Sequence, residues 1–286
     1  MRRVALLGLC LVACSSGNAP KSWSSHHPDL PGGGEVRVFL PPAGGNQRPL
    51  PTIYFLHDLF GSDSILWRQG VMSELEARMR RGEIPRVVVV APEGRHDYWS
   101  DFHARRRPWE SWLTGKLVGD VESRHDVSRD VSRRAIAGIS MGGYGAVKAA
   151  LRRPDLFSAA SSLSGVLVEQ RWEDLESAPW IARFTLKRVF GKRIDDNSFA
   201  RNDVYRMLDQ VPAAWRPALR VRCGSEDEYR LFGPARTFAE AARSKGFDVE
   251  LLIEPGHHDW RYWRGAILEE LSILARRVGG ADGTDS

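Results

Sequence analysis

The chain has 286 residues, of which 42% are hydrophobic and 27% are charged, a composition typical of globular proteins. This length suits one large α/β domain or two small ones and supports a substantial core. The net charge of +5 includes Arg2 and Arg3, which we expect to be removed with a signal peptide, and the remainder is too mild to favour nucleic acid as a partner.

The N-terminus has the features of an export signal. Residues 1–3 are a charged start, and residues 4–12 are an apolar stretch too short to span a bilayer as a helix. The hexapeptide LVACSS at residues 11–16 resembles a bacterial lipobox, in which the cysteine is lipidated. We therefore predict a lipoprotein signal peptide over residues 1–13, lipidation of Cys14 and a cell-envelope location. Cleavage of a plain secretory signal near Ala19 is the alternative.

The chain has 3 cysteines, at positions 10, 14 and 223. If Cys10 is removed and Cys14 is lipidated, Cys223 alone remains, which excludes a disulfide framework in the mature monomer. Cys223 ends a predicted strand and is interpreted as a small core residue. No other Cys/His spacing resembles a metal site, so we expect no metal.

Residues 14–33 are rich in Ser, Pro, Gly and His and are typical of a flexible tether. A domain is expected over residues 34–278. It begins with strands over 35–40, 52–57 and 86–91, and the last of these has the continuous apolar run of a central parallel strand. Helices are predicted over 67–81 and 109–123.

The alternation of strands and helices continues in the second half of the chain. Strands are predicted at 135–139, 157–164, 219–223 and 249–254, and helices at 141 onward, 234–245 and 262–278. The pattern is lost over 165–217, which we interpret as an insertion or lid over the strand ends, or as a surface excursion. Residues 279–286 are expected to form a disordered tail. The alternation predicts a doubly wound, mainly parallel sheet.

The segment AIAGISMGGYGA at residues 135–146 contains Gly-x-Ser-x-Gly between a predicted strand and a predicted helix. This is the arrangement of a nucleophile elbow, with Ser140 on a strained turn. Side chains at Gly138 and Gly142 would collide with neighbouring backbone. Met141 begins the helix, where its free N–H can face an oxyanion. A glycine-rich turn with an idle serine is the alternative.

A serine hydroxyl needs a base, and the base needs an orienting carboxylate. In this fold the acid follows a late strand and the histidine follows the last one. Asp227 is the favoured acid, with Glu226 and Glu228 as alternatives. One of His257 and His258 is the expected base, and Asp259 is expected to cap the last helix. A second oxyanion N–H is expected after the strand at 52–57, at Leu59.

Three separated segments resemble the putative-esterase family, which includes esterase D, feruloyl and acetylxylan esterases, enterochelin esterases and the antigen 85 mycolyltransferases. They are ISMGGYGA at 139–146, RPDLF at 153–157 and GHHDWRYW at 256–263. The resemblance covers roughly residues 35–275. It implies the α/β-hydrolase fold and a Ser-Asp-His triad at Ser140, Asp227 and His258. It also implies an oxyanion donor at Leu59. The insertion inferred from the lost pattern over 165–217 would follow the sixth strand of this fold.

Two positions depart from that family. His57 is followed by Asp58 where the family usually has glycine, and His257 also stands where glycine is usual. The segments APEG at 91–94 and YWSDF at 98–102 resemble the substrate-side loop of the feruloyl esterase and mycolyltransferase branches.

These features predict a serine carboxylic-ester hydrolase that acts through an acyl-enzyme on a small-molecule or saccharide ester. No metal or organic cofactor is implied, and the expected membrane partner is reached through the lipid anchor. The alternative is transfer of the acyl group to a cell-envelope sugar or another alcohol. A third hypothesis, a non-enzymatic envelope binding protein, is disfavoured because every triad position is filled.

Overall fold

The computed structural model describes residues 20–44, 49–101, 107–168, 187, 189 and 201–280. Within these ranges the chain forms one sheet of eight strands in the order β1-β2-β4-β3-β5-β6-β7-β8. The strands are β1 (Lys21–Ser24), β2 (Glu35–Phe39), β3 (Thr52–Leu56), β4 (Val88–Pro92), β5 (Arg134–Ile139), β6 (Ala159–Leu163), β7 (Ala218–Gly224) and β8 (Val249–Glu254).

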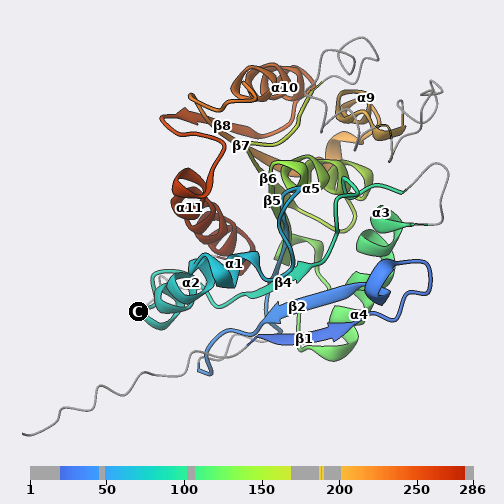
Figure 1. Cartoon of the computed structure of the whole chain (residues 1–286), viewed down its shortest axis with the longest axis vertical. Helices are drawn as coiled ribbons and strands as arrows, with labels where there is room; N and C mark the ends of the chain where they lie inside the picture. The colour runs from blue at the N-terminus through green and yellow to red at the C-terminus, as the bar shows by residue number, and fades with distance from the viewer. Residues whose placement is uncertain are drawn as a thin grey trace, which may run out of the picture.

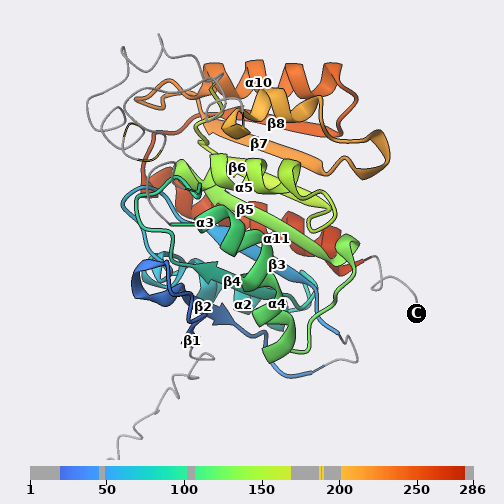
Figure 2. The same cartoon turned by 90° about the vertical axis from the view of Figure 1, so that its right-hand side faces the viewer.

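The sheet is antiparallel at one edge and parallel elsewhere. Strand β2 pairs antiparallel with both β1 and β4, whereas every pair from β4 to β8 is parallel. Figure 2 shows the strands in this order, from β1 at the bottom to β8 near the top. The carboxyl ends of the parallel strands therefore meet at one edge of the sheet, where loops from several strands can form a common site.

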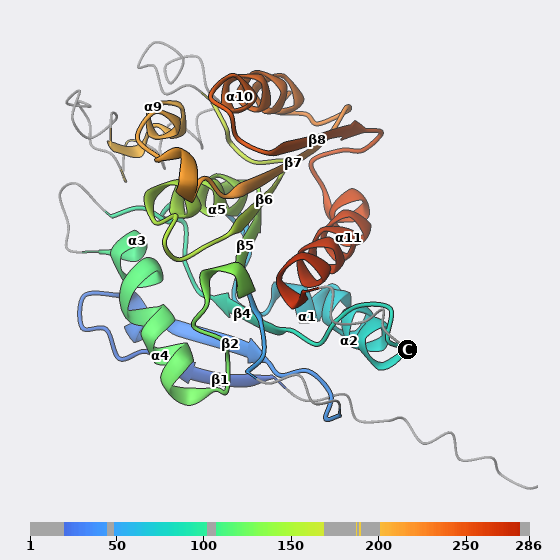
Figure 3. The same ribbon diagram turned by 180° about the vertical axis from the view of Figure 1, so that it is seen from behind.

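Helices cover both faces of the sheet (Figures 1 and 3). One face carries α1 (Ile65–Arg68), α2 (Val71–Arg80) and α11 (Trp260–Gly279). The other carries α3 (Trp109–Ser111), α4 (Leu117–Arg124), α5 (Met141–Arg152), α9 (Val204–Leu208) and α10 (Phe232–Ser244). The predicted fold class, a doubly wound, mainly parallel sheet, is confirmed.

The two hydrophobic clusters follow from the alternation of side chains along the central strands. In β3, Tyr54 and Leu56 belong to the cluster under α5, while Ile53 and Phe55 belong to the cluster under α11. All of β3, β4 and β5 is buried, as expected for strands with a layer of helices on each face.

The prediction of a flexible tether over residues 14–33 is wrong for residues 20–33. Strand β1 adds to the edge of the sheet, and a short turn of helix spans Pro31–Gly33. The hydroxyl of Ser25 accepts a hydrogen bond from the indole of Trp112 at 3.0 Å, and Leu30 is buried. The Ser- and Gly-rich composition suggested a linker because the contacts that order this segment come from distant residues. Residues 14–19 lie outside the described ranges.

The helix predicted over residues 67–81 is divided in two. Gly70 has φ = 71°, which ends α1 and begins α2. This left-handed conformation is one that glycine adopts without steric cost.

Part of the predicted domain plan falls outside the described ranges. This applies to the signal peptide at 1–13, to Cys14, to most of the insertion or lid over 165–217 and to residues 281–286 of the tail. In the described part of the insertion, α9 lies next to α5 and α10 (Figure 1). No helix in the described part of the chain is both long enough and apolar enough to cross a membrane.

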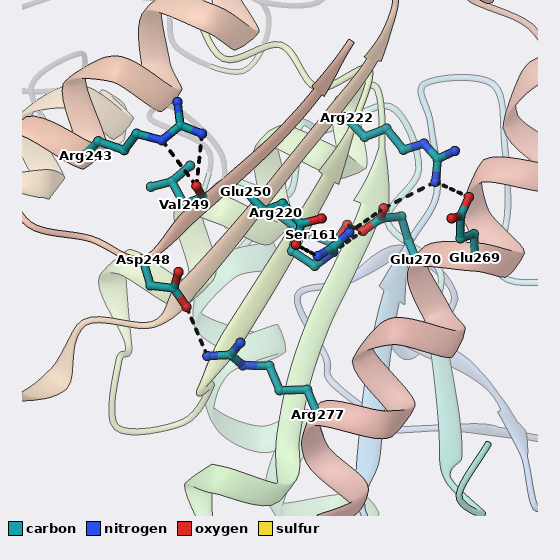
Figure 4. Close-up of polar contacts among 10 residues, drawn as sticks. All are labelled: Ser161, Arg220, Arg222, Arg243, Asp248, Val249, Glu250, Glu269, Glu270 and Arg277. Carbon is teal, nitrogen blue, oxygen red and sulfur yellow. Dashed lines mark hydrogen bonds and ion pairs between the residues drawn. The ribbon is translucent and has the colours of Figure 1, made fainter. Parts of the chain in front are cut away.

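A network of charged residues joins α11 to the sheet (Figure 4). The carboxylate of Glu270 on α11 is buried and accepts hydrogen bonds from Ser161 of β6 and Arg220 of β7, each at 2.8 Å. Arg222, also on β7, donates to Glu269 at 2.7 Å. These contacts fix the middle of α11, which begins at Trp260, two residues after His258.

Candidate active site

Ser140 lies on a sharp turn between β5 and α5. Its backbone has φ = 52° and ψ = −116°, which is a strained conformation for a residue other than glycine. A Cβ atom at Gly142 would lie 2.1 Å from the carbonyl oxygen of Leu56, and one at Gly138 would lie 2.3 Å from that of Gly142. Both positions therefore require glycine, as the sequence indicated. The turn presents the serine hydroxyl at the carboxyl end of β5.

The structure brings Ser140, His258 and Asp227 together although they are far apart in the chain. The Nε2 atom of His258 lies 3.0 Å from Oγ of Ser140, and Nδ1 lies 2.6 Å from Oδ2 of Asp227. With the proton of the imidazole on Nδ1, His258 donates to the carboxylate and accepts from the hydroxyl. This is the arrangement in which a histidine can remove a proton from serine.

Asp227 is held rigidly beside the histidine. Its side chain is fully buried, and its second oxygen, Oδ1, accepts hydrogen bonds from the backbone N–H groups of Tyr229 at 3.0 Å and Leu231 at 3.4 Å. These donors compensate for the water that a buried carboxylate loses. The carboxylate is thereby fixed in one orientation toward His258.

The imidazole of His258 is also restrained by aromatic rings on two sides. Tyr229 lies 4.8 Å away and Trp263 4.7 Å away, measured between ring centroids, and both contacts are edge-to-face. The indole of Trp263 in turn donates a hydrogen bond to the hydroxyl of Ser164 at 3.1 Å. Neither ring was singled out by the sequence, although each lies within five residues of a predicted site residue.

The remaining acid and base candidates form a separate contact. Glu226 and Glu228 both pair with the side chain of His257, which is half exposed, and not with the imidazole of His258. Asp259 accepts hydrogen bonds from the N–H groups of Arg261 and Tyr262 and is the N-cap of α11, as predicted. Among the adjacent histidines, His258 is the one that contacts Ser140.

The two oxyanion candidates lie at the ends of neighbouring strands. Met141 is the first residue of α5, where a backbone N–H has no acceptor within the helix. Leu59 follows β3 in a turn closed by a hydrogen bond from the N–H of Gly61 to the carbonyl of Asp58 at 3.1 Å. The Asp58 carbonyl also accepts from Nδ1 of His57 at 2.7 Å. These two contacts order the backbone of the turn, whereas Oδ1 of the Asp58 side chain is buried without a hydrogen-bond partner among the described residues.

His57 has a structural role that sequence reasoning missed. Its ring is buried, and its Nε2 accepts a hydrogen bond from the backbone N–H of Gly94 at 2.9 Å. The loop after β3 is thereby tied to the loop after β4. The sequence offered one indication of this role, a histidine at the end of an otherwise apolar strand. A buried imidazole requires polar partners, so such a histidine is expected to hold neighbouring backbone.

A second missed group lies beneath the loop at residues 98–101. Tyr98 and Trp99 both have positive φ values, of 51° and 50°, which is costly for aromatic residues. Lys148 of α5 is completely buried and pairs with Glu110 at 3.2 Å, and its ammonium also donates to the hydroxyl of Ser100. The strained loop is therefore fastened to the helix that begins after Ser140.

The described residues contain no group of three or more His, Cys, Asp or Glu side chains with a geometry suited to a metal ion. Cys223 is a free, buried thiol, as predicted. Burial raises the pKa of this thiol to about 12, so that Cys223 is a core residue and not a nucleophile.

The sheet order, the serine on a strand-to-helix turn and the acid and histidine after β7 and β8 define an α/β-hydrolase. A family model described as Putative esterase matches residues 30–274. The chain therefore belongs to this family of esterases and is a carboxylic ester hydrolase.

Individual relatives agree with this assignment. An acetyl esterase of Caldicellulosiruptor saccharolyticus is 26% identical over 236 residues, which cover 79% of this chain and 84% of that protein. Esterase Rv1288 of Mycobacterium tuberculosis is 28% identical over 202 residues, but the match spans only 42% of its length. The substrate-bound structure of the Staphylococcus aureus fluorophosphonate-binding serine hydrolase FphF has a TM-score of 0.74 at 25% identity, over 90% of this chain and 98% of that one.

Proposed function

We propose that the protein hydrolyses carboxylic esters through an acyl-enzyme formed on Ser140, with His258 as the base and Asp227 as the orienting acid. The observation that carries the proposal is the continuous contact from Asp227 through His258 to Ser140, at 2.6 and 3.0 Å. The strained conformation of Ser140 and the burial of Asp227 support it further.

In the first half of the reaction, Oγ of Ser140 attacks the ester carbonyl while its proton moves to Nε2 of His258. The positive charge on the imidazolium is balanced by Asp227. The N–H groups of Met141 and Leu59 hold the negative oxygen of the tetrahedral intermediate, and each such donor is typically worth about 3 kcal/mol. His258 then gives its proton to the leaving alcohol, which leaves the acyl group on Ser140.

In the second half, water replaces the alcohol. His258 takes a proton from the water as the water attacks the acyl carbonyl, and it returns this proton to Oγ of Ser140 as the acid departs. The same three side chains therefore serve both halves. The substrate class that we propose is a small-molecule or saccharide ester, and the acetyl esterase among the relatives supports a short acyl group.

A series of p-nitrophenyl esters, from acetyl to long acyl chains, tests the proposal. We expect turnover by the protein and a decrease in kcat of at least about 10⁴-fold in Ser140→Ala. The matched control is Ser123→Ala, which removes an exposed serine of α4. Near-normal turnover by Ser140→Ala would disprove the role of this serine.

We also propose that the enzyme is held at a bacterial cell envelope by a lipid on Cys14. The proposal is supported by the LVACSS sequence at residues 11–16 and by the charged and apolar segments before it. Expression of the full chain in a bacterial host should place the protein in the membrane fraction, with a mass that shows diacylglycerol on Cys14. Cys14→Ser should release the protein from the membrane, and a membrane-bound Cys14→Ser protein would contradict the proposal.

A further inference from the structure

His257 bridges two carboxylates on either side of the candidate acid. Its Nδ1 lies 2.8 Å from Glu228, and its Nε2 lies 2.9 Å from Glu226. A neutral imidazole carries one proton and can donate to only one of these oxygens. Contacts of this length from both ring nitrogens to carboxylates therefore fit the imidazolium form, in which both nitrogens donate.

The same bridge reaches the backbone of the candidate base. The second oxygen of Glu228 accepts a hydrogen bond from the N–H of His258 at 2.9 Å. The loop after β7 and the loop after β8 also meet through the N–H of Glu226 and the carbonyl of Gly256 at 3.0 Å. The position of His258 relative to Asp227 therefore depends on contacts between these two loops.

We infer that His257, as an imidazolium, is a positioning residue that ties the base loop to the acid loop and keeps His258 aligned with Asp227 and Ser140. The inference rests on the proposed function, because it concerns the alignment of the same triad. It also gives a role to His257, which lies next to the candidate base but takes no part in the triad itself.

The charges around His257 favour its protonated form. The pKa of His257 is raised by its hydrogen bond to Glu228 and by the charges of Glu228, Glu226 and Asp259. The pKa of the Glu228 carboxyl is lowered by the hydrogen bond from the N–H of His258. His257 lines an open groove of about 740 Å³. The other polar and charged side chains that line this groove, besides Asp259, are Arg78, Arg222, Glu254, Arg261, Tyr262, Glu269 and Arg276.

The direction of the pH effect follows from the raised pKa. The bridge is complete below the pKa of His257 in the folded protein and loses one of its two hydrogen bonds as the pH rises through that value. His257 and both of its partners are more than half exposed, so solvent and salt weaken the interaction. We therefore expect a change in kcat of about two- to fivefold rather than a complete loss.

The test uses the full-length chain in detergent and compares wild type with His257→Gly, His257→Gln and His257→Lys. At neutral pH, kcat should fall about two- to fivefold in the glycine and glutamine variants, with little change in KM. The alkaline decrease in kcat of the wild type should disappear in these two variants. The lysine variant should recover kcat and shift the decrease to higher pH, because its ammonium keeps its charge. His27→Gln is the control for an unrelated histidine.

Two results would separate this inference from the proposed function. The first result is that His257→Gly and His257→Gln have the kcat of wild type and the same decrease in kcat at alkaline pH, while Ser140→Ala is inactive. This result would overturn the inference about His257 and leave the proposed function standing. Retained turnover in Ser140→Ala would overturn the proposed function, and the inference with it. If high salt removes the difference in kcat between wild type and His257→Gln, the result would support an electrostatic bridge at His257.

Discussion

The indole of Trp99 donates a hydrogen bond to the carbonyl oxygen of His57 at 3.3 Å, and the two rings pack edge-to-face with centroids 5.1 Å apart. Trp99 is completely buried against two glycines. A Cβ atom at Gly94 would lie 2.5 Å from its ring, and one at Gly145 would lie 2.8 Å from its side chain. Trp99 therefore connects the candidate oxyanion loop after β3 with the helix that follows Ser140.

We predict that Trp99→Phe keeps the fold but loses the hydrogen bond that orients this loop. Because small displacements of an oxyanion donor reduce transition-state stabilisation, kcat should fall about tenfold, with KM changed by less than about twofold. Steady-state kinetics on a p-nitrophenyl ester provide the measurement. The matched control is Trp112→Phe, which also removes a buried indole hydrogen bond, to Ser25, but near the antiparallel edge of the sheet. Equal losses of kcat in both variants would contradict the role of Trp99.

Gly142→Ala should disrupt the turn that carries Ser140, because the new methyl group would lie 2.1 Å from the carbonyl oxygen of Leu56. We expect little soluble protein or, where the protein folds, a loss of activity of at least about a hundredfold. Gly119→Ala in α4 is the control, since nothing lies within 4 Å of its Cβ position. That variant should be active and slightly more stable, by up to about 1 kcal/mol. Normal activity in Gly142→Ala would contradict the assigned turn geometry.

The elements with strong local signals could be predicted from the sequence. The strands β3 and β4 could be recognised from their own apolar runs, and the turn at Ser140 from the glycines on either side of it, because these patterns lie within a few consecutive residues. The chain order of an α/β-hydrolase then indicated where the acid and the histidine should be sought. Sequence alone favoured Asp227 but kept Glu226 and Glu228 as alternatives, because all three carboxylates follow the same strand. Only the folded loops show that Asp227 turns inward to His258, while Glu226 and Glu228 meet His257.

The features that could not be predicted depend on contacts between distant segments. Strand β1 has a Ser-rich sequence with little strand propensity, and it is ordered by pairing with β2 and by the contact of Ser25 with Trp112. The roles of His57 and Lys148 likewise depend on Gly94 and Glu110, which are separated from them by 37 and 38 positions in the chain. Local pattern and propensity contain no information about such partners.

Glu270 should contribute more to stability than other charged residues of the same network (Figure 4). Glu270→Gln leaves Arg220 and Arg222 without their shared buried partner, and we expect the free energy of unfolding to fall by about 3 kcal/mol. Urea denaturation monitored by tryptophan fluorescence measures this change. Glu250→Gln removes an exposed partner of Arg220 and should cost less than about 1 kcal/mol. Similar costs for the two variants would show that the network is not effectively buried.

Cys223 should be unreactive in the folded protein. Burial raises its pKa to about 12, and its thiol contacts Oδ2 of Asp227 at 3.8 Å. In a protein that begins at Ser15, Cys223 is the one remaining thiol, and its reaction with Ellman's reagent at pH 8 should be at least about a thousandfold slower than in concentrated urea. Rapid labelling under native conditions would contradict the burial of this residue.

The raised pKa of Cys223 also sets the sign of a stability effect. The unfolded chain releases the thiol proton near the ordinary cysteine pKa, whereas the folded chain keeps it until the pH approaches 12. Stability should therefore decrease as the pH rises above about 8.5. Cys223→Ala should remove this part of the decrease in stability at alkaline pH. Urea denaturation of wild type and Cys223→Ala between pH 8 and pH 10 measures the difference. An equal alkaline loss in both proteins would contradict the assignment.

Hydrolysis of p-nitrophenyl acetate by wild type, Ser140→Ala and Ser123→Ala tests most directly whether Ser140 is the nucleophile. We predict turnover by wild type and by Ser123→Ala, and a decrease in kcat of at least about 10⁴-fold in Ser140→Ala with its thermal unfolding unchanged or slightly improved. Mass spectrometry of wild type after rapid acid quench should show an added acetyl group on the peptide that contains Ser140. Turnover by Ser140→Ala close to that of wild type, or an acetyl group on another residue, would contradict the central claim.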